Sequence, residues 1–218
     1  MKQTKIILII GMLVIWWSCE RETVTGNVSR VTYFVDLILK GEELIFLKLN
    51  ENFTDPGAEA NEKGAPVTVT KKGAVSTATA GFYRLSYSAS NSDGFSSEVT
   101  RTVIVYEDKP VTGIYNGTRV GRTGGLILIS SNPDGSFHIS DLLGGYYEYG
   151  QGFGPDYAAP ATLTLNGNEF TTPGGLCAFG PVDVSNAHVS DDQRTWEWTI
   201  TLTDFAFGFN VKLTKITE

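Results

Sequence analysis

Short runs in which apolar and polar residues alternate, separated by turn residues, make up most of this chain. The clearest run is TWEWTITLT (195–203), and its apolar side consists of Trp196, Trp198, Ile200 and Leu202. The segment from Phe207 to Leu213 repeats the alternation. A period of two residues is typical of an antiparallel strand with one buried face. Both tryptophans are therefore predicted to lie in a core, although rings of this kind also stack on sugars.

No apolar stretch after residue 19 has a helical period, so the sequence predicts an all-β protein. Its length suits two small β domains. The polar, proline-containing stretch 107–110 follows a strand end and is interpreted as a linker. We therefore expect a first domain over 31–106 and a second over 111–218.

The first domain contains five readable strands. They are VTYFVDLIL (31–39), LIFLKL (44–49), PVTVTKK (66–72), FYRLSYSAS (82–90) and FSSEVTRTVIVY (95–106). The turn Asn91–Gly94 joins the last two, and its residues tolerate positive φ, which favours a hairpin over a calcium loop. Tyr83, Leu85 and Tyr87 share one face, which Val99, Val103 and Val105 are expected to continue across a bulge.

The first 18 residues have the order of an export signal, with lysines followed by an apolar run from Ile6 to Trp17. This run is too short to span a bilayer. Cys19, which follows this run after Ser18, resembles the lipidated residue of bacterial lipoprotein signals. Residues 1–18 are thus predicted to be a signal peptide, Cys19 a lipidation site and 19–30 a flexible tether. The alternative is an ordinary secretory signal with an incidental cysteine.

The residues that follow Cys19 indicate where the protein is located. Glu20-Arg21-Glu22 resembles the export signal that sends lipoproteins to the outer face of the outer membrane. Removal of 1–18, which holds two lysines and no acids, changes the net charge from −7 to −9. An acidic chain without basic clusters argues against nucleic acid, and against membrane contact other than through a lipid anchor. If Cys19 is lipidated, Cys177 has no disulfide partner, and it is predicted to be a small buried residue.

Several motifs in the first domain carry a family resemblance. NFTDPGAEA (52–60), the Gly81-x-Tyr83 start of a strand and the closing Arg101-Thr102-Val103 resemble the bacterial immunoglobulin-like domain of surface lipoproteins. The resemblance implies a seven-stranded sandwich with no active site, acting as a spacer or lending a surface to a neighbour.

The C-terminal part resembles the second domain of a group of Bacteroidetes surface lipoproteins of unassigned function. SDLLGGYY, GFGPDYAAPATLTL and FGFNVKLTK carry this resemblance. The group is associated with glycan-import systems of the starch-utilisation kind, which implies extracellular carbohydrate handling. The predicted fold is therefore an immunoglobulin-like sandwich followed by a second antiparallel β-sandwich or flattened β-barrel.

The sequence lacks a recognisable catalytic constellation. His138 and His188 are far apart, and no cluster has the spacing of metal ligands. A glycosidase needs two carboxylates across a cleft, and nothing marks a pair among the candidates Asp141, Glu148, Asp156 and Asp183. We expect no enzyme activity, no metal and no cofactor.

The stretch LLGGYYEYGQGFGPDYAAP (142–160) is the candidate ligand site, because it combines five glycines with five aromatic residues. The proposed sugar-binding residues are Tyr146, Tyr147, Glu148, Tyr149, Phe153, Asp156 and Tyr157. Their rings would stack on a polysaccharide or oligosaccharide, and the two acids would accept its hydroxyls. If this segment were a strand, Tyr147 and Tyr149 would share a face. In the alternative, the rings are buried and the protein is a structural lipoprotein that packs against an outer-membrane transporter complex.

Overall fold

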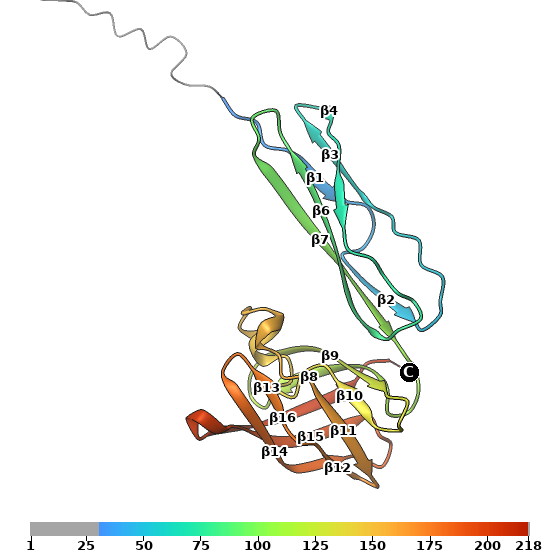
Figure 1. The fold of residues 1–218 in the computed structure, drawn as a ribbon, viewed down its shortest axis with the longest axis vertical. Coiled ribbons are helices and arrows are strands. Elements are labelled where there is room, and N and C mark those ends of the chain that lie inside the picture. Colours follow the sequence, from blue (N-terminus) through green and yellow to red (C-terminus); the bar gives the residue numbers. More distant parts are fainter. Residues whose placement is uncertain (1–30, 218) are drawn as a thin grey trace, which may run out of the picture. The chain divides into compact units, whose positions relative to one another are not determined.

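The computed structural model describes residues 31–217, which fold almost entirely into β-strands (Figure 1). The predicted signal peptide (1–18), Cys19 and the tether (19–30) lie outside the described residues. Within the described part of the chain, no helix is long and apolar enough to span a bilayer. The all-β prediction is confirmed.

The N-terminal strands form a seven-stranded sandwich of the predicted immunoglobulin-like kind. One sheet has the order β1-β3-β4 and the other has the order β2-β7-β6-β5. The strands are β1 (Asp36–Leu39), β2 (Leu44–Lys48), β3 (Ala58–Glu62), β4 (Ala65–Pro66), β5 (Thr70–Lys72), β6 (Gly81–Ser90) and β7 (Ser96–Tyr106). β2 runs parallel to β7, and the other neighbours are antiparallel. Sequence analysis did not identify β3, whose AEANE has no alternation of apolar residues.

The β6–β7 hairpin forms as predicted, but its register is regular. The Asn91 side-chain oxygen accepts the backbone N–H groups of Asp93 and Phe95 and so closes the turn. Tyr83 pairs with Val103, Leu85 with Arg101 and Tyr87 with Val99, without a shift. The expected bulge was therefore wrong, because the inward position between Val99 and Val103 belongs to a charged residue, Arg101.

Arg101 is fully buried and holds the motif residues of the sandwich together. Its guanidinium forms an ion pair with Asp55 at 2.6 Å and donates to the carbonyl oxygens of Glu42 and Lys40. Burial alone would raise the pKa of the Asp55 carboxyl. Hydrogen bonds from Lys71, Tyr87 and the Gly57 N–H outweigh it and hold that pKa well below its usual range. The TDPGA motif thus supplies the carboxylate, and the RTV motif the guanidinium, of one partly buried ion pair.

The C-terminal strands form a single nine-stranded antiparallel sheet that curls on itself (Figure 1). Its order is β12-β11-β10-β9-β8-β16-β15-β14-β13. The strands are β8 (Gly113–Arg119), β9 (Gly124–Ser131), β10 (Phe137–Ile139), β11 (Ala161–Asn166), β12 (Glu169–Thr171), β13 (Gly175–Cys177), β14 (Gly180–Val189), β15 (Thr195–Leu202) and β16 (Phe207–Lys215). Sequence analysis missed β13 and β14. Segment 107–110, predicted to be a linker, lies between the end of β7 and the start of β8.

The inner side of the curled sheet is filled by the residues that the alternation of β15 predicted to be buried. Trp196 is fully buried and Trp198 is 2% exposed, and the Phe170 ring centroid lies 5.2 Å and 5.6 Å from theirs. This confirms that the tryptophans belong to the core. The alternation of β16 extends beyond the core, because Phe207 remains 41% exposed.

Candidate functional site

Asp141 fixes both ends of the aromatic segment. Its carboxylate is fully buried and accepts the backbone N–H groups of Leu143, Gly145 and Ala159, each at 2.8 Å. Burial raises the pKa of this carboxyl, and the three N–H donors oppose the rise. In addition, the Trp198 indole N–H donates to the Leu142 carbonyl at 3.0 Å. Residues 142–159 therefore form a loop tied closed at its base.

The first glycines of the loop allow its backbone to lie directly on the β8–β9 hairpin. A Cβ added at Gly145 would lie 2.6 Å from the backbone nitrogen of Gly125, and one at Gly124 would lie 2.5 Å from the Gly144 carbonyl oxygen. Both distances are below any ordinary contact, so side chains at these positions would separate the loop from the sheet. These glycines therefore let the loop backbone pack closely against the β8–β9 hairpin.

The loop contains no strand. Tyr146–Gly150 forms a single π-helical turn, η2, and Pro155–Tyr157 forms a 3-10 turn, η3. Tyr147 packs against the core of the sheet, whereas the Tyr149 ring lies over Gly125. Tyr147 and Tyr149 therefore do not share a face, as a strand would have required.

Eight rings form one contiguous group, which we call the aromatic cluster. Its members are Tyr146, Tyr147, Phe153, Tyr157, Phe179, Phe205, Phe207 and Phe209. Phe179 is central, with centroid distances of 4.8 Å to Tyr147, 5.2 Å to Tyr157 and 6.4 Å to Phe205. The Phe153 ring is nearly parallel to that of Tyr147, at 18° and 6.3 Å. The structure thus brings four of the five predicted rings together and adds four others.

Part of the aromatic cluster is open to solvent. Phe153 is 51% exposed, Phe205 63% and Phe207 41%, whereas Tyr146, Tyr147 and Tyr157 are half-buried. Tyr149 is 40% exposed but makes no ring contact with the cluster among the described residues. The inner rings hold the outer ones in place, which is how a rigid apolar platform for a ligand is built.

Arg119, at the end of β8, places a positive charge within the cluster. Its guanidinium carbon lies 4.6 Å from the Phe209 centroid, 4.9 Å from that of Tyr146 and 5.1 Å from that of Phe207. These distances are within the range of cation–π attraction. The charge that contacts the rings of the cluster is therefore a base, Arg119.

The candidate carboxylates do not converge on a cleft. Glu148 is half-buried, and its carboxylate oxygen Oε1 lies 3.5 Å from the guanidinium nitrogen Nη2 of Arg84. Burial raises the pKa of this carboxyl. Asp156 is exposed at the first turn of η3, and Asp183 is exposed on β14. The Asp141 carboxylate already accepts three backbone N–H groups and is not free to contact a ligand. Among residues 31–217, no group of three His, Cys, Asp or Glu side chains is arranged to hold a metal ion.

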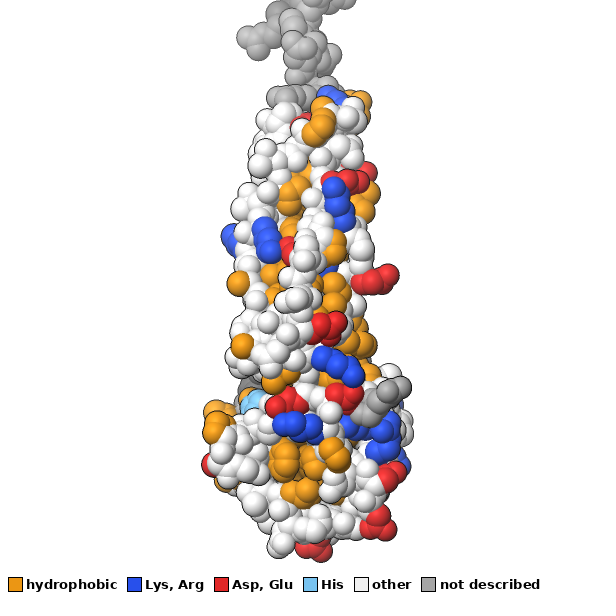
Figure 2. Space-filling view, turned by 90° about the vertical axis from the view of Figure 1, so that its right-hand side faces the viewer, with side chains coloured by type: hydrophobic (Ala, Val, Ile, Leu, Met, Phe, Trp, Pro, Cys, Tyr) orange, Lys and Arg blue, Asp and Glu red, His pale blue; other side chains and the backbone are white. Residues whose placement is uncertain are grey.

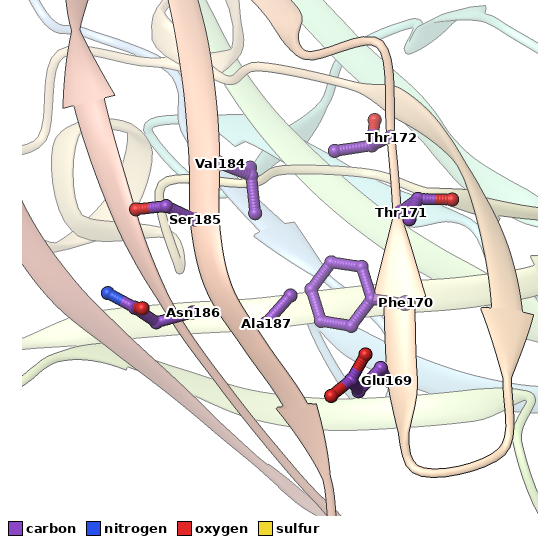
Figure 3. A pocket seen from close by; sticks show the side chains of 8 residues that line it. All are labelled: Glu169, Phe170, Thr171, Thr172, Val184, Ser185, Asn186 and Ala187. Atoms are coloured by element: carbon purple, nitrogen blue, oxygen red, sulfur yellow. The ribbon is translucent and has the colours of Figure 1, made fainter.

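Two other features of the surface do not form a ring-lined site. On the face shown in Figure 2, acidic and basic side chains are interspersed. A hollow of about 370 Å³ lies between β12 and β14 (Figure 3). Phe170 lies between these strands near Ala187, while Ser185 and Asn186 point away. Because Phe170 is 3% exposed, this hollow offers no ring for stacking.

Sequence analysis missed five components of the cluster. It predicted Phe207 and Phe209 only as strand residues, and it did not single out Phe179, Phe205 or Arg119. The run FAFGF (205–209) carried a usable signal, since three aromatic residues in five exceed what one strand end buries. No comparable signal marked Phe179 or Arg119, which reach the cluster only through the curl of the sheet.

Comparisons with known proteins agree with the architecture. A bacterial surface immunoglobulin-like domain model matches residues 37–105, and a BT2262-like C-terminal domain model matches residues 72–215. No curated protein matches the chain. The crystal structure of the lipoprotein BT2262 from Bacteroides thetaiotaomicron is similar, with 34% identity and a TM-score of 0.67. The match covers 84% of this chain and 100% of that one. The chain therefore belongs to the BT2262-like family, with a bacterial surface immunoglobulin-like domain preceding the family's C-terminal domain.

Proposed function

We propose that this chain is a non-catalytic lipoprotein that binds glycans on the cell exterior through the exposed rings of the aromatic cluster. Phe153 carries the proposal, because a half-exposed ring stacked on Tyr147 is a ready platform for the apolar face of a sugar. Phe205 and Phe207 extend the platform. The exposed carboxylate of Asp156 lies next to Tyr157 in η3, where it is available to accept sugar hydroxyls.

Location at the outer face of the outer membrane is part of the same proposal. The similarity to a Bacteroides lipoprotein supports it, as does the apolar run that ends two residues before Cys19. Labelled fatty acid should enter the wild-type protein and not Cys19→Ala. Equal labelling of both, or of neither, would refute the lipid anchor.

The glycan proposal is tested with the full chain in detergent on a glycan array. Phe153→Ala and Phe205→Ala should each weaken retention about fivefold or more, since a stacking ring contributes about 1 kcal/mol. Phe95→Ala is the matched control, because Phe95 is also 51% exposed but lies at the β6–β7 hairpin. Absence of binding to any glycan, or an equal loss in the control, would refute the proposal.

A second candidate is a structural lipoprotein that packs against an outer-membrane transporter complex. Leu176 favours it, because an aliphatic side chain 69% exposed on the edge strand β13 suits a protein partner better than a sugar. Under this alternative, Leu176→Asp abolishes co-purification with membrane partners and leaves glycan retention unchanged. Loss of glycan retention in Phe153→Ala would speak for the first candidate.

A further inference from the structure

Arg119 lies in a row of inward-facing residues of β8 and β16 that is otherwise apolar except for Lys215 at its far end. It pairs with Val211 of β16, and the next inward pairs along the two strands are Gly117 with Leu213 and Tyr115 with Lys215. Directly paired residues share one face of a sheet. Since Val211 is 1% exposed and Tyr115 is fully buried, Arg119 lies on the core-facing side, at the end where the core opens to solvent.

The guanidinium of Arg119 is held by rings alone. Within the described residues, it forms no ion pair and donates no hydrogen bond, and its contacts are with the faces of Tyr146, Phe207 and Phe209. Cation–π contacts use the flat face of the guanidinium and leave its five in-plane N–H donors available. Its nitrogens are not among the buried polar atoms that lack a partner, so these donors open to solvent.

This arrangement suits a planar anion. A guanidinium presents two parallel N–H donors that match the two oxygens of a carboxylate. Surrounding rings lower the local polarity, which strengthens such a pair relative to one in open water. The partly exposed Phe207 ring, 5.1 Å from the guanidinium carbon, gives an adjoining surface on which a sugar ring can stack.

We infer that the aromatic cluster binds acidic glycans, with Arg119 pairing with the carboxylate of a uronic acid unit that stacks on Phe207. This inference rests on the proposed glycan-binding function and names the class of sugar. Because the chain carries a net charge of −7, a locally positive, ring-lined site favours the approach of such a polymer there.

The test measures binding of the full chain in detergent to polygalacturonate, to a neutral glucan and to dextran sulfate. Wild-type protein should bind polygalacturonate, and Arg119→Met should weaken this at least about tenfold, as expected for a charge-assisted pair. Arg119→Lys should recover only part of the loss, because lysine keeps the charge but not the fork. Arg122→Met, which removes the same charge at an exposed turn residue, should bind as the wild type does.

Each contrary result has a defined meaning. Unchanged binding of polygalacturonate by Arg119→Met, or an equal loss in Arg122→Met, overturns the inference. Equally tight, Arg119-dependent binding of dextran sulfate overturns the choice of a carboxylate. Retention of neutral glycans alone refutes the acidic class and leaves the glycan-binding function standing, whereas binding of no glycan refutes both. Should Arg119→Met fail to fold by its melting curve, the decisive result is whether Arg119→Lys weakens polygalacturonate binding selectively.

Discussion

Replacing Asp141 by asparagine should detach one end of the aromatic loop while changing the side-chain volume very little. One carboxylate oxygen accepts Leu143 and Ala159, and the other accepts Gly145. In Asp141→Asn the amide oxygen keeps one set of donors, and the amide nitrogen faces the N–H that the second oxygen accepted. A buried donor then lacks a partner, which costs about 1–3 kcal/mol.

The expected effect is a free energy of unfolding lower by about 2 kcal/mol, or a melting temperature lower by about 4–8 °C. Asp141→Ala leaves all three N–H groups unpaired and should cost about 3 kcal/mol or more. Both variants are measured by urea unfolding of a chain that starts at residue 20, which retains only Trp196 and Trp198 of the four tryptophans. Because Trp198 donates to Leu142, its fluorescence also reports whether the loop is in place.

Asp156→Asn is the matched control, since it makes the same substitution at an exposed position of the same loop. It should change the stability by no more than about 0.5 kcal/mol. The reasoning fails if Asp141→Asn unfolds at the wild-type urea midpoint, or if the Asp156 control loses as much stability.

Three other predictions concern buried groups. Arg101→Met should lower the free energy of unfolding in urea by about 2–3 kcal/mol. It removes one of the two cations that pair with Asp55 and leaves the Glu42 and Lys40 carbonyl oxygens without their donor; a loss under about 1 kcal/mol would contradict this. The pKa of Asp55 is lowered in the folded state, so its ionised form stabilises the fold above about pH 4, and this stabilisation is lost as the pH falls through the folded pKa. The difference in melting temperature between wild type and Asp55→Asn should therefore shrink from about pH 6 to about pH 2, and a constant difference would refute the assignment. Cys177 is 8% exposed and burial raises its pKa, so iodoacetamide should modify it only after unfolding, as mass spectrometry of its peptide would show.

The sequence by itself determined the features that depend on neighbouring residues. Strict alternation in 195–203 was sufficient to place Trp196 and Trp198 in the core, because a strand sends successive side chains to opposite faces. The turn chemistry of Asn91–Gly94 likewise determined the hairpin. Both follow from local backbone geometry, which needs no knowledge of the rest of the chain.

Only the tertiary structure decided which polar residues are buried and which rings are exposed. Arg101 occupies an apolar position of β7 because Asp55, 46 residues earlier in the chain, neutralises it there. Asp141 was indistinguishable from other acids until the fold placed three N–H groups around it. Phe207 continues the buried row of β16 yet remains exposed, since the core ends before the strand does. Burial of a charge or exposure of a ring depends on partners distant in sequence, and only the folded chain brings those partners together.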